Sequence, residues 1–341
     1  MELLAEPVWR VRERAHAARV DAATAGHRTR RASGEPHPVE DFLFTYYSLS
    51  PSKLRRWHPG LGASLAGAAT TERSGWRFYH ADGDTVTLDV EAFLAARGRT
   101  VTFVRDLLAA TLSRPAHLSC FGLHEWAMVH GSGRSDGEVP RHGSYPLRLG
   151  PAGTDDVVES HAVSCTHADA YRFFTASARP LNSLSPTRDS QVALEQPGCL
   201  HTGMDCYKWA YQLAPASSSA LVADCFDLAR DIRVLDMRAA PYDLTALGLQ
   251  PVCVETRAGK AEYLAAQRAF VPRANALRRR ILEVCDALLA HAEGRDVELE
   301  QGQLPTGDDA ARHRTDPTRA VGEVERLGVG VGLDPQSSPA S

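Results

Sequence analysis

The second half of the chain carries three long stretches in which apolar residues recur with the period of an α-helix. These stretches are residues 199–213, 218–237 and 261–292. An amphipathic helix must bury its apolar face against another element of the fold. Three such helices therefore predict a body of packed helices, and this feature constrains the fold more than any other.

The first half of the chain adds a small β element. Residues 76–90, WRFYHADGDTVTLDV, alternate on either side of the turn sequence ADGD and predict a β-hairpin. Residues 91–115 have helical periodicity and stop before a proline. Residues 153–165 alternate and predict a strand, which a helix over 167–178 follows. We expect a mainly α fold, with α+β possible: a single globular domain of packed helices with a small β element in its first half.

Composition sets the expected boundaries of this domain. Residues 1–36 predict an N-terminal helix followed by a basic, flexible run, HRTRRASGEP. Residues 37–292 show no break that could be a linker, so we expect one catalytic or binding domain there. Residues 293–341 are polar, rich in Gly and Pro and without period, which predicts a disordered tail.

Charge and cysteine content limit the partners. The net charge is −4 and the isoelectric point is near 6.4, so a nucleic-acid contact would need a local basic patch. No apolar run approaches the roughly 20 residues that a bilayer requires, so we expect no membrane partner. The N-terminus lacks the pattern of a signal peptide, and the 7 cysteines favour free thiols; both predict a cytoplasmic protein.

The densest cluster of reactive side chains is EQPGCLHTGMDCYKWAY, residues 195–211. In a helix that begins after the Pro-Gly pair, His201 and Asp205 lie one turn apart and Lys208 follows on the same face. A histidine and a carboxylate so placed can share a metal ion, or the carboxylate can orient the imidazole as a general base. The alternative is an amphipathic helix whose polar stripe faces water.

A second candidate is CFGLHEWAMVH, residues 120–130. His124 and Glu125 are flanked almost entirely by apolar residues, so the segment is expected to be buried and its charged pair to need partners. The alternative is a core histidine that bonds to a backbone carbonyl.

A third candidate is VESHAVSCTHADAYRFF, residues 158–174. His161 and Cys165 lie four positions apart, and His167 follows. Together with His124 upstream, the order His-x(n)-His-x-x-x-Cys resembles the attachment pattern of bacterial haem hydroxylases that act on tyrosine derivatives. The resemblance implies that His124 or His161 is an axial ligand and that Cys165 is bonded to the porphyrin.

A fourth candidate is HPVEDFLFTYYSLSPSKLRRWHPG, residues 37–60, where aromatic and basic side chains are interleaved. Basic groups among stacking rings are what a single-stranded or extruded base needs. The alternative is a packed helix with a basic C-terminal cap. The side chains concerned include Tyr46, Tyr47, Lys53, Arg55, Arg56 and Trp57.

Several of these phrases, with ADCFDLARDIRVLDMRAAPYDL and GKAEYLAAQRAF, resemble one family of mostly high-GC bacterial proteins usually labelled 3-methyladenine DNA glycosylase. The resemblance covers roughly residues 37 to 285. It implies removal of an alkylated base by cleavage of its N-glycosidic bond, without a cofactor and with DNA as partner.

The residues can be assigned to that chemistry, which needs an aromatic pocket and a carboxylate that stabilises the oxocarbenium ion. Asp205, Glu125 or Glu195 would be the carboxylate, and His201 would relay a proton. Lys208 would contact a phosphate, and Arg188 would bind a phosphate or carboxylate. The aromatic candidates are Tyr46, Tyr47, Trp57, Trp126, Tyr207 and Trp209.

Our leading expectation is thus a DNA base-excision glycosylase. The alternative is an oxidoreductase that uses haem or a divalent transition metal and acts on a small molecule. Its expected ligands are His124, His161, Cys165 and His167, with His201 nearby. A third expectation is a small-molecule binding protein without catalytic activity.

Overall fold

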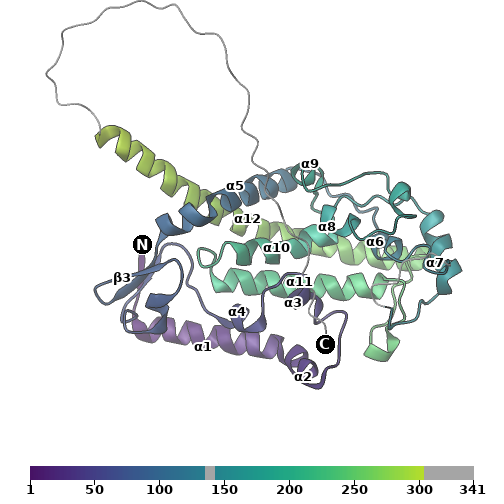
Figure 1. The fold of residues 1–341 in the computed structure, drawn as a ribbon, viewed down its shortest axis with the longest axis horizontal. Coiled ribbons are helices and arrows are strands. Elements are labelled where there is room, and N and C mark those ends of the chain that lie inside the picture. The colour runs from purple at the N-terminus through teal and green to yellow at the C-terminus, as the bar shows by residue number, and fades with distance from the viewer. Residues whose placement is uncertain (135–142, 303–341) are drawn as a thin grey trace, which may run out of the picture. The chain divides into compact units, whose positions relative to one another are not determined.

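The computed structural model describes residues 1–134 and 143–302, and helices dominate it (Figure 1). The chain is about 57% helical, and the described residues contain a small four-stranded sheet in the first half. This confirms the mainly α class with α+β character. The chain divides into a compact unit, Met1–Glu298, and a second unit, Leu299–Ser341. The candidate site and the cavities described below belong to the first unit.

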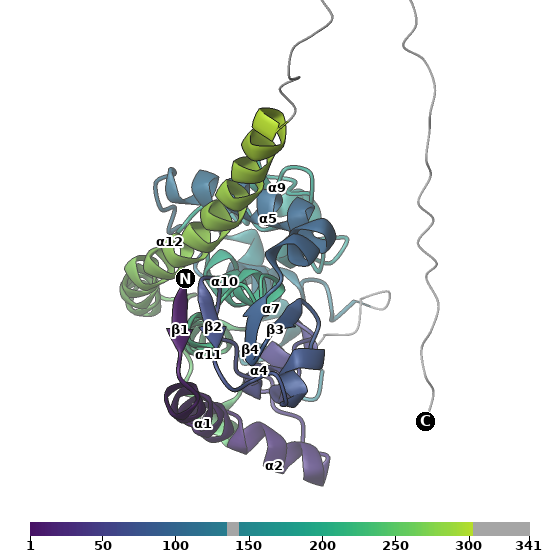
Figure 2. The same cartoon turned by 90° about the vertical axis from the view of Figure 1, so that its left-hand side faces the viewer.

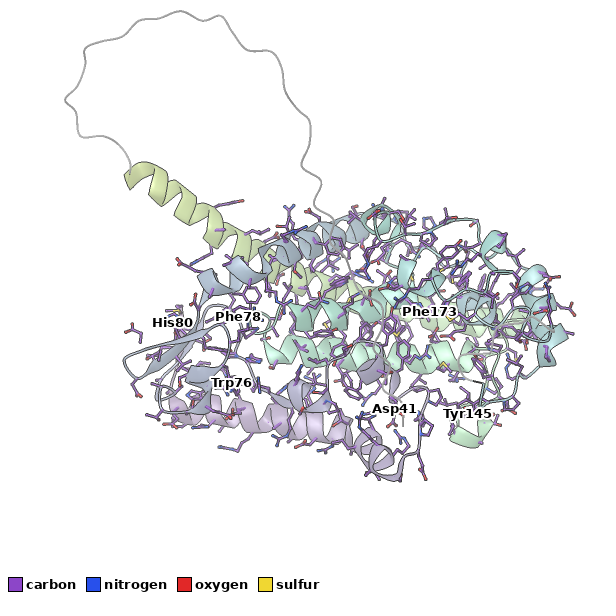
Figure 3. The ribbon with its side chains drawn as sticks, in the orientation of Figure 1. Asp41, Trp76, Phe78, His80, Tyr145 and Phe173 are labelled. Carbon is purple, nitrogen blue, oxygen red and sulfur yellow. The ribbon has the colours of Figure 1, made fainter. Side chains whose placement is uncertain are left out.

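The sheet consists of β1 (Glu2–Leu4), β2 (Ala63–Leu65), β3 (Tyr79–Asp82) and β4 (Thr85–Leu88), in the order β1-β2-β4-β3. β1 and β2 are parallel, and the other two pairs are antiparallel (Figure 2). β3 and β4 form the predicted hairpin, with Asp82 opposite Thr85 across the turn. Trp76, Phe78 and His80 lie at this end of the unit (Figure 3). The sheet has a small core of its own, formed by Leu4, Trp9, Trp57, Leu65, Ala68 and Val86.

The N-terminal segment is more ordered than its composition predicts. α1 (Glu6–Ala23) is followed by α2 (Ala25–Ser33), so the basic run expected to be flexible is helical as far as Ser33. Its anchor is His27, which is buried and whose Nδ1 lies 2.6 Å from Oδ1 of Asp41. The helix is held in place because His27 pairs with Asp41, a residue from the next segment. The composition of the run alone does not show this pairing.

The long helices follow the predicted periodicity. They are α5 (Val90–Leu112), α10 (Leu200–Gln212), α11 (Ser219–Ala239) and α12 (Arg257–Gly302). α12 continues to Gly302, which corrects the boundary expected at residue 293. The rest of the predicted tail, from residue 303, lies outside the described residues.

α10 and α11 pack side by side through the centre of the unit (Figure 1). Gly203 permits a close approach, because a Cβ there would lie 2.8 Å from Cδ1 of Ile232 on α11. Both helices are mostly buried, and the buried residues of α10 lie on nearly every face of that helix. The stripe formed by His201 and Asp205 is therefore buried, and the water-facing alternative is wrong.

Short elements connect the long helices. They are α3 (Phe42–Thr45), α4 (Pro51–Arg55), η1 (Glu72–Gly75), α6 (Leu123–Ala127), α7 (Gly150–Glu159), α8 (Ala168–Tyr171), η2 (Arg179–Leu181), α9 (Gln191–Leu194) and η3 (Thr245–Leu247).

Two predictions in this region are corrected. Residues 153–165 do not form a strand, because most of the segment belongs to α7. Thr154, Val157 and Val158 are buried with the i, i+3, i+4 spacing of a helix, a pattern that the apparent alternation concealed. The helix expected over 167–178 is limited to α8 and gives way to turns.

A search of the described helices finds none with the length and apolar character needed to cross a membrane.

Candidate functional site

Two groups of buried metal-ligand side chains lie next to each other in the core. The first contains His124, His201 and Asp236, and the second contains His167, Glu195 and Asp205. Within each group the donor atoms lie within 4.8 Å of one another. The ring of His201 joins the groups: its centroid lies 4.5 Å from that of His124 and 5.2 Å from that of His167.

Several elements bring these side chains together. α10 supplies His201 and Asp205, one turn apart as the sequence predicts, and α11 supplies Asp236. His124 lies on α6, which Gly122 begins with a φ of +73°. A side chain at Gly122 would be strained at that φ and would also meet Tyr263 at 3.3 Å, so glycine suits this entry.

In the first group, His124 is bonded on both sides. Its Nε2 lies 2.8 Å from Oδ1 of Asp236, and its Nδ1 lies 3.6 Å from Sγ of Cys120. Burial lowers the pKa of His124, but the Asp236 carboxylate outweighs burial, so the pKa lies well above its ordinary value. Burial likewise opposes ionisation of Asp236, yet His124 and then Arg233 hold the pKa of that carboxyl well below its usual range.

Asp236 is paired with Arg233, which is also paired with Glu125. Nη1 of Arg233 donates to Oδ2 of Asp236 and, at 2.7 Å, to Oε1 of Glu125. The guanidinium is buried, and its carbon lies 3.9 Å from the ring centroid of Phe42. Glu125 is thus a buried ion-pair partner of Arg233.

His201 differs from the other two histidines. It is only 5% exposed, and among the described residues neither of its ring nitrogens has a hydrogen-bond partner. Burial and then the charge of His124 hold the pKa of His201 well below its ordinary value. The ring also lines two cavities, so a neutral nitrogen of His201 is accessible to a small ligand there.

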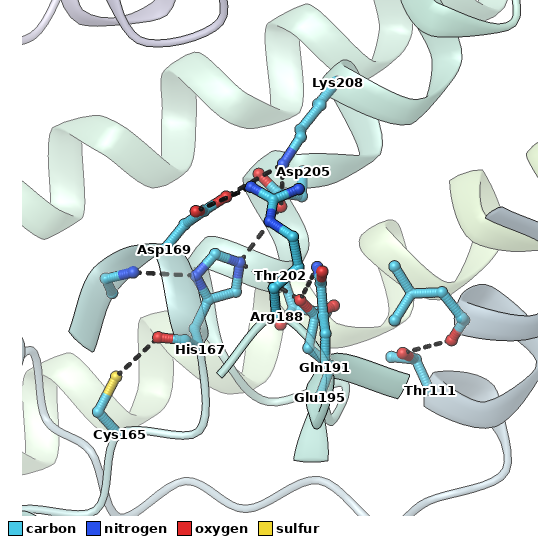
Figure 4. A network of polar contacts seen from close by, with 12 residues as sticks. Thr111, Cys165, His167, Asp169, Arg188, Gln191, Glu195, Thr202, Asp205 and Lys208 are labelled. Carbon is cyan, nitrogen blue, oxygen red and sulfur yellow. Dashed lines mark hydrogen bonds and ion pairs between the residues drawn. The ribbon is translucent and has the colours of Figure 1, made fainter. Parts of the chain in front are cut away.

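The second group is a hydrogen-bonded network (Figure 4). Nε2 of His167 lies 3.2 Å from Oδ2 of Asp205 and 3.5 Å from Oε1 of Glu195. The hydroxyl of Tyr47 donates to Oδ1 of Asp205 at 2.9 Å, and Nζ of Lys208 lies 3.6 Å from Oδ2. Burial raises the pKa of Glu195, while Lys208 and His167 overcome burial and hold the pKa of Asp205 well below its usual range.

From Lys208 the network continues to the surface. Nζ of Lys208 lies 3.2 Å from Oδ2 of Asp169, and Arg188 lies 3.5 Å from the other oxygen of that carboxylate. The Arg188 side chain is 71% exposed, so the predicted anion-binding arginine is in fact paired with a carboxylate at the edge of the network.

The two groups differ in their capacity to hold a cation. His167 is the N-cap of α8, and its Nδ1 accepts the backbone amide of Ala170 at 3.3 Å. A neutral ring that accepts at Nδ1 carries its hydrogen on Nε2. Burial opposes protonation, but Asp205 raises the pKa of His167, and the imidazolium also has a hydrogen on Nε2. In either form the nitrogen that faces the carboxylates carries a hydrogen. Nε2 of His124 faces Asp236 in the same way, so an ion in the first group would have to displace that proton. Of the two groups the first is the better ion site, because it also contains His201, whose neutral ring keeps a nitrogen lone pair available.

Two small cavities lie on either side of His201. One, about 20 Å³, is lined by His201, His124 and three thiols, those of Cys120, Cys165 and Cys199. The other, about 10 Å³, is lined by His201, Glu125, Asp169, Arg233, Met128 and the aromatic rings of Phe42, Tyr46 and Phe173. Each has the size of a single water molecule or ion.

Several predicted site residues lie elsewhere. His161 belongs to neither group, and its Nδ1 lies 2.6 Å from the carbonyl oxygen of Val157 at the end of α7. Trp126 is a core residue whose Nε1 donates to the carbonyl of Ala239 at 2.8 Å. Trp57 belongs to the core beneath the sheet. Tyr207 and Trp209 are buried on α10 in ring contacts with Tyr47 and Phe103, respectively.

Sequence reasoning missed Asp236 and Arg233. Both lie in the stretch 218–237, from which the sequence predicts an amphipathic helix but no site residue. The available signal was their position beside Ile232 and Leu235 on the apolar side of the helix, because a charged residue there is buried and needs partners.

Comparisons with family models, with curated proteins and with solved structures find no match for this chain.

Proposed function

We propose that this protein is a metal-dependent enzyme in which His124, His201 and Asp236 hold one divalent transition-metal ion. The observation that carries the proposal is the buried imidazole of His201, whose nitrogen lies within 4.8 Å of the donor atoms of His124 and Asp236. Two histidines and one carboxylate bind iron(II) in oxygenases and zinc in hydrolases. With iron, the protein would be an oxidoreductase.

The surrounding side chains fit that role. Nδ1 of His124 faces Cys120, and Oδ2 of Asp236 accepts from Arg233, so both ligands are oriented from behind. When bound, the ion would act as a Lewis acid or a redox centre. A small substrate could approach His201 through the aromatic cavity of Phe42, Tyr46 and Phe173 only if these rings moved, because the cavity has a volume of about 10 Å³.

The residues do not fit a haem. His161 is bonded at the end of α7, and Sγ of Cys165 donates to the carbonyl of His167 at 3.7 Å. The cavity that Cys165 and His124 share is about 20 Å³, far too small for a porphyrin. The haem alternative therefore has no support in the arrangement of its expected ligands.

The metal content of the freshly purified protein tests the proposal. We expect one iron or zinc ion per chain in the wild type and none in His201→Ala or Asp236→Asn. The matched controls are His161→Ala, which removes a histidine outside both groups, and Asp205→Asn, which alters the second group. A wild type free of transition metal, even after reconstitution with iron(II) or zinc, would refute the proposal.

A second proposal is base-excision activity on alkylated DNA, with no cofactor. The observation that favours it is the second cavity, where the rings of Phe42, Tyr46 and Phe173 surround His201, Glu125 and Asp169. Aromatic walls and a carboxylate are what the excision of a cationic base needs. A base would have to displace the rings that close the cavity, because its volume is about 10 Å³.

Release of free base from methylated DNA tests this second proposal. We expect the release to be lost in Glu125→Gln, which removes a carboxylate that lines the cavity, and retained in Cys165→Ala. If neither metal nor base release is found, a non-catalytic binding protein becomes the better description.

A further inference from the structure

A groove of about 400 Å³ lies between α1, α4 and η1, apart from the histidine groups. Trp76, which lines it, lies beside the sheet, whereas Phe173 of the aromatic cavity lies among the helices (Figure 3). The groove is within the size range of small-ligand sites. Neither proposed function uses it.

Two guanidinium groups lie over the ring of Trp76, and the set of Arg56, Trp76 and Arg73 is called the column below; Arg56 and Trp76 line the groove. The guanidinium carbon of Arg56 lies 4.5 Å from the ring centroid of Trp76, and that of Arg73 lies at the same 4.5 Å. Arg73 is buried and is neutralised by Glu13, and it also donates to the carbonyl of Trp57 at 2.6 Å. Arg73 is therefore held in place at one end of the column, and Glu13 neutralises its charge.

Arg56 is held by an indole ring and not by a carboxylate. Among the described residues, no carboxylate lies within ion-pair distance of Arg56 or of Arg14, which lines the same groove. A cation–π contact positions a guanidinium without neutralising its charge. Its donors remain available for an oxyanion in the paired geometry that phosphate favours.

The groove has a net positive charge once the charges that are already paired with each other are set aside. Arg55 is paired with Asp21, and Glu13 with Arg73, so Glu72 is the remaining anion against Arg14 and Arg56. A smaller cavity of about 160 Å³ also contains Arg56 and adds Lys53 and Tyr211. The ligand that suits both is an anion with a planar part.

We propose that this groove binds a nucleotide, either free or as a unit of a single strand. Arg56 and Arg14 hold the phosphate, and the base stacks on the Trp76–Arg56 column, since guanidinium planes and indole rings both accept a base. This site stands independently of the metal centre, and either can fail alone.

The test is equilibrium binding of AMP and of a short single-stranded oligodeoxyadenylate to the full-length protein, with inorganic phosphate as a third ligand. We expect Arg56→Gln and Arg14→Gln to weaken nucleotide binding by about tenfold each, because each removes a charge-assisted bond. Arg99→Gln on α5 is the matched control: it makes the same charge change at an exposed position outside the groove. Circular dichroism checks that each variant is folded.

AMP binding that Arg56→Gln weakens and Arg99→Gln does not would support a free nucleotide. A much higher affinity for the oligonucleotide, with the same dependence on Arg56, would support a strand. Absence of saturable binding, equal binding by Arg56→Gln and Arg99→Gln, or inorganic phosphate binding as tightly as AMP would each overturn the proposal. The metal content of Arg56→Gln should equal that of the wild type, which separates the two sites.

Discussion

Three buried histidines lie in ring contact, yet their neighbours give them different chemical roles. Despite burial, Asp236 raises the pKa of His124, so His124 can bind an ion only after it releases the proton that faces Asp236. Burial and the charge of His124 keep His201 neutral, and His167 caps a helix with Nδ1. The residue type alone predicts a candidate ligand in every case. Only the partner atoms show which nitrogen is free to bind an ion, and they select His201.

Arg233 allows a prediction about stability. Arg233→Met would leave Glu125 and Asp236 buried without their common cation, so we expect a loss of about 3–5 kcal/mol in the free energy of unfolding. Urea denaturation measures it. Arg230→Met on the same helix is the control. Its 38% exposed side chain makes a surface pair with Asp227 and a long hydrogen bond of 3.5 Å to the carbonyl of Ala23, so it should change stability by less than about 1 kcal/mol. Equal effects of the two variants would contradict the prediction.

His58 predicts a pH dependence of stability. Burial, followed by the charges of Arg73 and Arg56, lowers the pKa of His58 to about 3 from an ordinary 6.5. Between these values the unfolded chain binds a proton that the folded protein does not. Stability therefore falls as the pH is lowered through this window, by at most about 1.4 kcal/mol per pH unit from this group.

We expect His58→Gln to lose stability less steeply than the wild type as the pH is lowered from about 6 to about 4. Urea denaturation at several pH values gives the slopes. His80→Gln, at an exposed position on β3, should keep the wild-type slope. A His58→Gln slope equal to that of the wild type would show that His58 does not contribute.

At the level of elements, α10 connects the two histidine groups because it contributes a residue to each. His201 belongs to the first group and Asp205 to the second, one turn apart on a helix that is buried against α11. The close contact at Gly203 fixes the distance between α10 and Asp236 on α11. The geometry of the candidate ion site is therefore set by helix packing rather than by a loop.

Two glycines in helices predict opposite effects of the same substitution. Gly98 lies inside α5, and a Cβ there would meet no atom within 4 Å, so Gly98→Ala should stabilise the protein by about 0.5–1 kcal/mol. Gly259 lies in the first turn of α12, where a Cβ would come within 2.0 Å of the backbone oxygen of Cys253. Gly259→Ala should destabilise by roughly 2–3 kcal/mol. Thermal unfolding of both variants checks the signs, and a stabilised Gly259→Ala would contradict the described packing.

At the level of the whole molecule, the proposed ion ligands come from distant parts of the chain. His124 and Asp236 are separated by 112 positions, and α6, α10 and α11 each contribute one ligand. An ion that binds only the folded state ties these helices together. It must then stabilise the entire unit by mass action.

Addition of iron(II) or zinc to chelator-treated protein should therefore raise its melting temperature. The expected gain in the free energy of unfolding is about 2.7 kcal/mol when the free ion concentration is roughly 100 times the Kd. Asp236→Asn should show no rise, whereas His161→Ala should respond as the wild type does. A rise in Asp236→Asn equal to that of the wild type would place the ion at another site.

Local patterns in the sequence determined the elements of this protein that are long or sharply punctuated. The periodicity of residues 199–213 and 218–237 predicted α10 and α11, and the ADGD turn predicted the hairpin, because helix period and turn chemistry are properties of neighbouring residues. Short segments were ambiguous: the alternation in 153–165 fits a strand as well as the helix that forms.

The site itself was decided by tertiary structure. The sequence placed His201 and Asp205 on one face of a helix, but which group each would join depends on side chains far away in the chain. Asp236 and Arg233 became buried partners, and His161 was left at the end of α7, because packing between distant helices selects contacts that no local pattern encodes. The sequence alone determined which residues could react, and only the fold decided which of them meet.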